Sequence, residues 1–344
     1  MLVTKTIKCR ILEPTNFKYN LLNQEYNNFQ DFMRLEANDL DWLADKIPIC
    51  FVYKGQARRF YKKISLEKEY PISVRKDIIR IKETNNKLSK YWIRISVKSK
   101  RCGLWLPIKQ HKEFPYGFKI CESKLLKKNN DFYVYITIQK EVEIRKSYSS
   151  VIAVDIGEKV LATVLLNGRP IFYGREIRGI RRHYAWLRKR LGERKLLKVI
   201  KRISDKEKRI VELKLHEISK QIVSLSDKHN SLIVLGDLKG IRKSAKGKRF
   251  NRIVSNMPYL KLTQYITYKA NWQGIQVIKT DERETSRTCS KCSLEGKRIN
   301  QGLFICRNCG YQANADFNAV KNIRNRSLEY ISEDGALVQA LKSS

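Results

Sequence analysis

The stretch that decides the fold is VIAVDIGEKVLATVLLNG, residues 151–168. Its apolar start predicts a strand that ends at Asp155, followed by a turn and a second strand. Further along, SLIVLGDLKG (231–240) predicts a buried strand that ends in Gly-Asp, and KLTQYITYKANWQG (261–274) predicts a helix closed by its last glycine. IQVIKTDE (275–282) predicts another strand. This mixture of strands and helices predicts an α/β fold.

Two aspartates in this region are candidates for metal binding. Asp155 ends a buried strand, and Gly157 behind it leaves room for a backbone or a phosphate to approach. Asp316 lies in NADFNAVKN (314–322). Carboxylates that meet around two metal ions are what phosphodiester hydrolysis requires. The structural alternatives are a turn former at Asp155 and a helix N-cap at Asp316, and the N-cap is compatible with metal binding.

Two CxxC pairs separated by thirteen residues form the most specific motif in the chain. Four thiolates at this spacing predict one tetrahedral Zn²⁺. Because four sulfurs leave no open coordination position, we expect the zinc to be structural. Unrelated thiols or a redox CxxC are the alternatives. The four expected zinc ligands are Cys289, Cys292, Cys306 and Cys309.

The composition points to a polyanionic partner. The chain has 344 residues with 71 Lys and Arg against 34 Asp and Glu, which gives a net charge of +37. Nucleic acid is the expected partner, because each neutralised phosphate releases counterions. A soluble basic protein or a membrane-surface binder is the alternative. The sequence has neither an apolar run of membrane-spanning length nor a signal peptide, so we expect a cytoplasmic protein with no membrane contact.

Two basic segments are candidates for contact with phosphates. Residues 174–230 predict a helical hairpin broken near Gly192, although its arginines could instead form a solvated face. SAKGKRFNR (244–252) predicts a basic loop. The nucleic-acid-binding candidates are Arg181, Arg182, Arg188, Lys189, Arg190, Lys246, Lys248, Arg249 and Arg252.

The N-terminal part of the chain predicts a separate arrangement. Residues 1–13 predict a strand, residues 16–45 predict helices, and we expect helical material through about residue 85. From about residue 90 the pattern predicts strands, with NND (129–131) as a hairpin turn. We expect the first strand to join these in one antiparallel barrel or sandwich. Aromatic residues of the helical segment are expected in its core: Tyr26, Phe29, Phe32, Trp42 and Tyr53.

Several stretches, in this order, resemble the TnpB (OrfB) proteins of insertion sequences, which are relatives of the type V CRISPR nucleases. They are VIAVDIGEKVLATV, LIVLGDLKGIR, TSRTCSKC and FICRNCGYQANADFNAVKNI. The resemblance implies a RuvC nuclease domain of RNase H-like fold with a zinc ribbon, and a wedge β-barrel with a helical recognition insertion. It also implies a guide RNA derived from the end of the element and cleavage of matching double-stranded DNA.

The expected domains follow from the same resemblance. Residues 1–14 and 88–147 would be the wedge, and 15–87 the recognition insertion. Residues 148–285 and 314–326 would be the nuclease domain, 286–313 the ribbon, and 327–344 a tail.

The resemblance also implies catalytic roles, with one departure. Asp155 matches the first of the family's three carboxylates and Asp316 the third, so these would hold two Mg²⁺ or Mn²⁺ ions. The second is usually a glutamate, but Gly236 occupies its place. Asp237, re-aimed by a bulge, or Glu282 could replace it.

Three functions remain open at this stage. The first is an RNA-guided DNA endonuclease, and the second is an RNA-guided binder without cleavage, acting as a repressor. The third is an unguided RNase H-like nuclease or transposase. The oligomeric state is left open.

Overall fold

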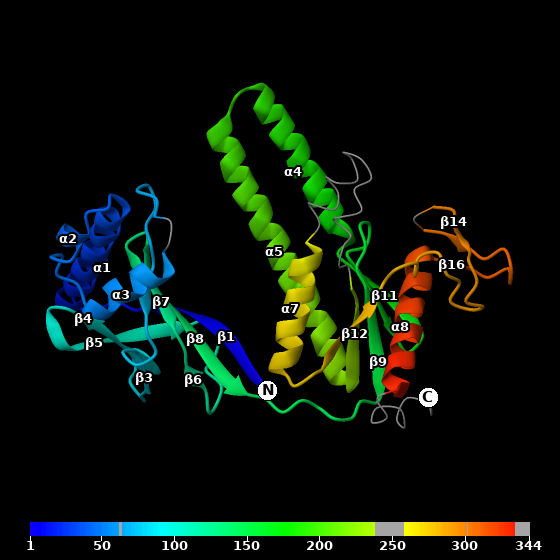
Figure 1. The fold of residues 1–344 in the computed structure, drawn as a ribbon, viewed down its shortest axis with the longest axis horizontal. Helices are drawn as coiled ribbons and strands as arrows, with labels where there is room; N and C mark the ends of the chain where they lie inside the picture. The colour runs from blue at the N-terminus through cyan, green and yellow to red at the C-terminus, as the bar shows by residue number, and fades with distance from the viewer. Residues whose placement is uncertain (62–63, 238–257, 301, 334–344) are drawn as a thin grey trace. The chain divides into compact units, whose positions relative to one another are not determined.

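A computed structural model describes residues 1–61, 64–237, 258–300 and 302–333 of the chain (Figure 1). The chain forms two compact units, Met1–Glu141 and Val142–Ser344. None of the helices in the described ranges has the combination of length and apolar character that crossing a bilayer requires.

The first unit is built on one antiparallel sheet of eight strands. Its strand order is β2-β7-β8-β1-β5-β4-β3, and β6 pairs with β8. The predicted union of the first strand with the later strands is confirmed, because β1 lies between β8 and β5. No pairing joins β2 to β3 within the described residues. The strands are β1 (Leu2–Ile11), β2 (Ile72–Val74), β3 (Arg80–Glu83), β4 (Tyr91–Val97), β5 (Lys100–Gln110), β6 (Lys119–Ile120), β7 (Ser123–Lys128) and β8 (Asp131–Glu141).

Local sequence explains the long strands of this sheet. Alternate residues of β4 and of most of β8 are buried, as expected for strands with one face against a core. Asn129 and Asn130 join β7 to β8 with φ of 50° and 63°. Asparagine tolerates this left-handed conformation, which two-residue hairpin turns require, so the predicted turn is confirmed.

The expectation of helix through residue 85 is wrong. Strands β2 and β3 lie in that segment and pair with β7 and β4. Pro71 directly precedes β2, and a proline there cannot continue a helix. The strand pairings are long-range contacts, which the mixed local pattern could not reveal.

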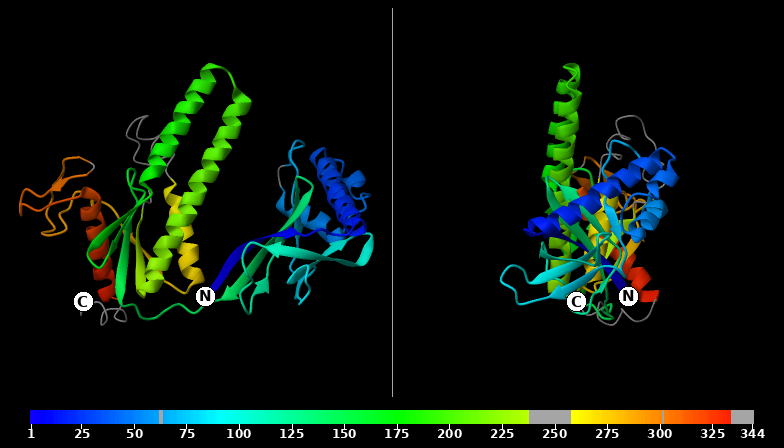
Figure 2. Two further views of the ribbon diagram at one scale, coloured as in Figure 1. Left: turned by 180° about the vertical axis from the view of Figure 1, so that it is seen from behind. Right: turned by 90° about the vertical axis from the view of Figure 1, so that its left-hand side faces the viewer.

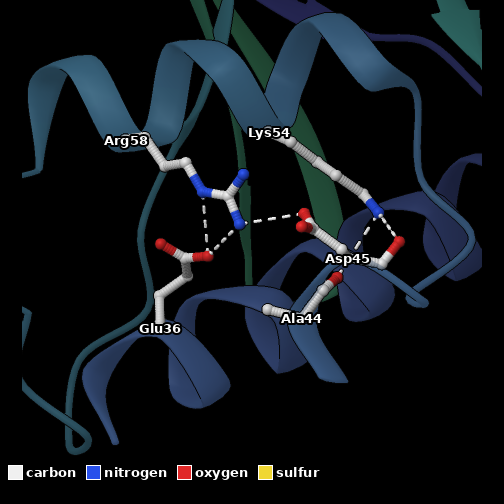
Figure 3. Close-up of polar contacts among 5 residues, drawn as sticks. All are labelled: Glu36, Ala44, Asp45, Lys54 and Arg58. Atoms are coloured by element: carbon white, nitrogen blue, oxygen red, sulfur yellow. Dashed lines mark hydrogen bonds and ion pairs between the residues drawn. The ribbon is translucent and has the colours of Figure 1, made fainter. Parts of the chain in front are cut away.

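Three helices of the first unit pack together through an apolar face and a polar cluster. They are α1 (Asn16–Ala37), α2 (Asp41–Ala44) and α3 (Phe51–Phe60). In the polar cluster, the guanidinium of Arg58 on α3 bonds Glu36, with atoms 2.6 and 3.0 Å apart, and also Asp45 at 2.9 Å (Figure 3). Lys54 donates to the backbone carbonyl of Asp45 at 2.6 Å. These bonds connect α3 to the end of α1 and to the loop after α2.

Four of the five aromatic residues expected in this core are buried: Tyr26, Phe29, Phe32 and Tyr53. The expectation is wrong for Trp42, which is 61% exposed. The ammonium of Lys46 lies over its ring, 4.8 Å from the centroid. Helix α2 has only four residues, so the helical spacing on which the expectation for Trp42 was based does not extend through this segment.

The second unit has a five-stranded sheet in the order β11-β10-β9-β12-β13. Strands β9, β10 and β11 are antiparallel, whereas β12 runs parallel to both β9 and β13. Helix α8 covers one face of the sheet, and α5 and α7 cover the other (Figures 1 and 2). This layered arrangement confirms the predicted mixed α/β fold. The elements are β9 (Ser150–Asp155), β10 (Ala162–Leu166), β11 (Arg169–Tyr173), β12 (Ser231–Asp237), β13 (Val277–Asp281), α4 (Arg175–Glu193), α5 (Leu197–Lys228), α7 (Tyr259–Trp272) and α8 (Ala315–Glu333).

The predicted helical hairpin is confirmed. Helix α4 ends at Glu193, one residue after Gly192, and α5 begins at Leu197. The C-terminal half of α5 packs on the sheet through Leu215, Ile218 and Ile222. The joined ends of the two helices extend away from the sheet (Figure 2). Helix α7 is followed by Gly274 with φ of 73°, which confirms the predicted helix end.

The cysteine-rich segment, which we call the ribbon, forms a small three-stranded sheet. Its strands are β14 (Lys297–Arg298), β15 (Phe304–Ile305) and β16 (Gln312–Ala313). Phe304 is fully buried against the cysteines. Gly296 is required beside it, because a Cβ there would lie 2.3 Å from the Phe304 ring.

Candidate active site and metal centre

Asp155 is the last residue of β9 and its side chain is almost fully buried. Burial raises the pKa of its carboxyl group, and the negative charge of Asp316 raises it further. A hydrogen bond with the carboxyl group of Glu282 acts in the opposite direction. A buried carboxyl group at a strand end, with two other acids nearby, is typical of a functional site.

Glu282 reaches Asp155 across an intervening strand. It follows the end of β13, which is separated from β9 by β12. The path crosses Gly236 on β12, where an ideal Cβ would lie 2.7 Å from Oε2 of Glu282 and 2.8 Å from its Cδ. The carboxyl group of Glu282 therefore occupies the space that a side chain at position 236 would fill.

The environment of Glu282 disfavours its charged form. Burial raises its pKa, and the charge of Asp155 and a hydrogen bond with that residue raise it further. The shared hydrogen bond therefore holds a proton mainly on Glu282, because two adjacent buried carboxylates cannot both ionise at low cost. Apart from the proton shared with Asp155, the buried Oε2 of Glu282 has no hydrogen-bond partner among the described residues. Such an unsatisfied buried oxygen fits a ligand for a divalent cation.

Asp237 lies on the other face of β12. The pairing of β12 with β13 runs through Gly236 and Asp237 without a shift, so the register shows no bulge that would re-aim this aspartate. Leu235 pairs with Val154, and continuing this register brings Gly236 level with Asp155. Successive strand residues point to opposite faces, so Asp237 points away from the face that Asp155 shares with Gly236.

Asp316 lies in the first turn of α8. The interpretation of Asp316 as an N-cap is wrong, because the side chain of Asn314 accepts hydrogen bonds from the backbone N–H groups of Asp316 and Phe317, at 2.9 and 3.1 Å. Asp316 instead forms a 2.9 Å ion pair with Arg298 of β14. Sequence patterns did not reveal this contact, because it joins the ribbon to a helix that begins seventeen residues later.

Positive groups surround the Asp316 carboxylate. Burial raises its pKa, while the charges of Arg298, Lys159 and Arg175 lower it, and burial prevails. The site therefore combines three acids with a rim of basic groups. This combination suits a divalent cation together with an anionic substrate.

The four cysteines of the ribbon are gathered as predicted. Their sulfurs all lie within 4.8 Å of one another, and in the described part of the chain no other set of three or more potential ligands is so compact. Cys289 Sγ lies 3.7 Å from Cys309 Sγ, and Cys292 Sγ lies 3.5 Å from Cys306 Sγ. Zn–S bonds of about 2.3 Å in a tetrahedron place sulfurs roughly 3.8 Å apart, so the geometry fits a zinc ion.

The basic candidates differ in their surroundings. Arg182, Lys189 and Arg190 are exposed on α4, and the Arg190 guanidinium lies 5.1 Å from the centre of the Trp186 ring. Arg188 forms an ion pair with Glu207 of α5, inside the hairpin. Arg181 is half-buried, and burial lowers its pKa. The expected loop contacts lie outside the described residues: Lys246, Lys248, Arg249 and Arg252.

Comparisons with known proteins match this region. The model of the family "Cas12f1-like, TNB domain" matches residues 259–323, which run from α7 through the ribbon into α8. A TnpB-like protein of Methanocaldococcus jannaschii is 29% identical over 242 residues, which cover 66% of this chain and 85% of that protein.

The chain is a relative of the TnpB-like proteins.

Two further similarities extend the relationship. CRISPR-associated endodeoxyribonuclease Cas12f1 of Sulfoacidibacillus thermotolerans is 32% identical over 225 residues, and the match spans 59% of this chain and about half of that protein, 52%. The crystal structure of the AacC2c1–sgRNA–extended non-target DNA ternary complex has a TM-score of 0.52 at 9% identity, and covers 86% of this chain and 59% of that one. The latter shows similarity of fold alone.

Proposed function

We propose that the chain is an RNA-guided, metal-dependent DNA endonuclease whose second catalytic carboxylate is Glu282. The observation that carries the proposal is the position of this carboxyl group, in the space above Gly236 and hydrogen-bonded to Asp155. With Asp316 nearby on α8, three acids from separate parts of the chain meet at one end of the sheet. The strand order β11-β10-β9-β12-β13 with helices on both faces supports a RuvC domain of RNase H-like fold.

Asp155, Glu282 and Asp316 would hold two Mg²⁺ or Mn²⁺ ions. Bound there, the ions would supply an activated water and stabilise the leaving oxygen of the phosphodiester. Arg298, Lys159 and Arg175 would attract the scissile phosphate.

The ribbon would hold one structural Zn²⁺ through its four thiolates. The three strands of the ribbon have two residues each, too few for a stable fold of their own. Metal binding would therefore supply much of the folding free energy of this segment. Through β14 it would also fix Arg298 beside Asp316.

The proposed partners are a guide RNA from the end of a mobile element and double-stranded target DNA. The net charge of +37 and the exposed basic face of α4 support binding to nucleic acid. The AacC2c1 complex, which is similar in fold, contains a single-guide RNA and DNA. The alternative of a guided binder without cleavage rests on Gly236, and the position of Glu282 beside this glycine supports cleavage instead.

The test is cleavage by the complex purified after co-expression with the native flanking DNA. Mg²⁺ and a DNA library that carries the guide-matched target are added, and the co-purified RNA is sequenced. We expect cleavage by the wild type and none by Asp155→Ala, with a defined flanking RNA bound to both. Target binding without cleavage would support the repressor function, and cleavage that needs no RNA would support an unguided nuclease.

A further inference from the structure

Three side chains on one face of α8 hold the segment 281–290. Asn318, Asn322 and Arg326 are spaced four residues apart, which aligns them along the helix. All three are bonded to the backbone of that segment rather than to its side chains. We call these three residues the α8 clamp.

The asparagines of the clamp hold the entrance to the ribbon. Asn318 donates to the carbonyl of Thr288 at 2.7 Å and accepts from the N–H of Ser290 at 2.9 Å. Asn322 donates to the carbonyls of Thr285 and Thr288, at 2.8 and 2.7 Å. Both asparagines are buried, so these bonds are shielded from competing water.

Arg326 holds the residues on both sides of Glu282. One nitrogen, Nη1, donates to the carbonyl of Asp281 at 3.0 Å and to the carbonyl of Arg283 at 2.6 Å. Glu282 itself lies beyond the last residue of β13, so the sheet does not fix its backbone. Its carbonyl accepts from the Thr285 hydroxyl at 2.9 Å, and Thr285 is in turn held by Asn322.

We propose that Arg326 is a positioning residue that places the Glu282 carboxyl group beside Asp155. The inference rests on the proposed function, in which Glu282 is the second catalytic carboxylate. A glutamate on β12 would be held by its strand neighbours on both sides, whereas Glu282 must cross β12 from a strand end. The two hydrogen bonds from Arg326 hold the backbone around Glu282 in place of the strand pairing that this residue lacks.

The first test compares two arginines of α8. Arg326→Met removes both hydrogen bonds and keeps the aliphatic stem, whereas Arg324→Met removes the same charge two positions away, on another face of the helix. Outer partners of metal ligands typically contribute about 10–100-fold to affinity or activity. We expect a loss of this size for Arg326→Met in the cleavage rate and in Mn²⁺ affinity, measured by electron paramagnetic resonance. Arg326→Lys should recover part of it.

Two further measurements separate positioning from folding. Binding of target DNA and the melting temperature should be the same in Arg326→Met and Arg324→Met. Equal losses of cleavage in these two variants, or no loss in Arg326→Met, would overturn the inference.

The second test moves the carboxylate back to β12. In the doubly substituted chain Gly236→Glu/Glu282→Ala, the new side chain takes the space that Glu282 has left. Adding Arg326→Met to this chain should change neither cleavage nor Mn²⁺ affinity. An undiminished effect there would show that Arg326 acts on something other than Glu282 and would overturn the proposal.

If the Gly236→Glu/Glu282→Ala chain does not cleave DNA, its Mn²⁺ affinity with and without Arg326→Met gives the same comparison. A wild type that binds Mn²⁺ without cleaving would refute the proposed function, and the Mn²⁺ affinities of the variants would still decide the role of Arg326. A wild type that neither cleaves nor binds Mn²⁺ would overturn both.

Discussion

Glu282 and Asp155 illustrate how a pair of interacting residues can come from strands that are not neighbours. Strand β12 lies between theirs, and a glycine on β12 gives the longer side chain a path. The sequence identified Asp155 and Glu282 as candidate catalytic acids. It could not choose between Glu282 and Asp237 for the second carboxylate. The choice depends on a register and on a side-chain path across a strand, and neither leaves a local pattern.

Substitution of these two acids should separate their roles. Glu282→Gln should lower the cleavage rate by about 10²–10³-fold, the usual effect of removing one electrostatic group from a preorganised site. Asp237→Asn should have little effect, because this residue points to the other face of β12. The measurement is single-turnover cleavage of guide-matched DNA. Comparable losses in both variants would contradict the assignment.

The shared proton predicts a dependence of stability on pH. Burial raises the pKa values of Glu282 and Asp155 above those of an unfolded chain. The folded protein therefore binds these protons more tightly, so the contribution of this pair to stability is greatest at low pH and falls as the pH rises through the raised pKa values. Thermal melting in buffer with zinc but without Mg²⁺ should show this fall from weakly acidic to alkaline pH. Glu282→Gln should flatten the curve, and an unchanged slope in that variant would contradict the expectation.

At the scale of elements, sequence patterns predicted the regular parts and missed the contacts between them. A strong local signal is present in β9, β10, β12 and β13, in the hairpin of α4 and α5, and in the cysteine cluster, whereas β11 was not predicted. Strands β2 and β3 were missed because partners distant in sequence stabilise them. The α8 clamp had one usable signal, namely asparagines at positions 318 and 322 close to the apolar residues Ala319, Val320 and Ile323.

Removing one clamp asparagine should loosen the entrance to the ribbon. Asn318→Ala leaves the carbonyl of Thr288 with one donor fewer and the N–H of Ser290 without its acceptor. An unmet buried bond costs about 1–3 kcal/mol, so hydrogen exchange at Ser290 should become faster. Asn325→Ala, an exposed position on the same helix, is the matched control and should leave that exchange unchanged. Slow exchange at Ser290 in Asn318→Ala would show that other contacts hold this segment.

At the scale of the whole molecule, charge predicts the partner better than any single residue does. A net charge of +37 disfavours a compact state unless a polyanion offsets it. The basic residues nevertheless are not equivalent. Exposed ones on α4 are available to phosphates, whereas Arg188 already neutralises Glu207. This division was hidden in the sequence, where all of these residues belong to one basic run.

The salt dependence of DNA binding should reveal the same division. Each phosphate contact contributes about 0.9 to the slope of log affinity against log salt. In an Asp155→Ala background, replacing Arg182, Lys189 and Arg190 with alanine should therefore reduce the slope by up to about 2.7 for guide-matched DNA. Arg188→Ala should leave the slope nearly unchanged. A larger effect from Arg188 than from the exposed three would contradict this assignment.

The close approach at Gly236 also limits how such a site can evolve. Side chains at positions 236 and 282 compete for one space, so an ancestor with glutamate on the central strand could not simply add a second and later discard the first. In a nuclease of the proposed kind, an exchange between the two positions would pass through chains in which one carboxylate is missing and cutting is impaired. Lineages at that stage would keep guided binding, and from them either a restored nuclease or a dedicated repressor could descend.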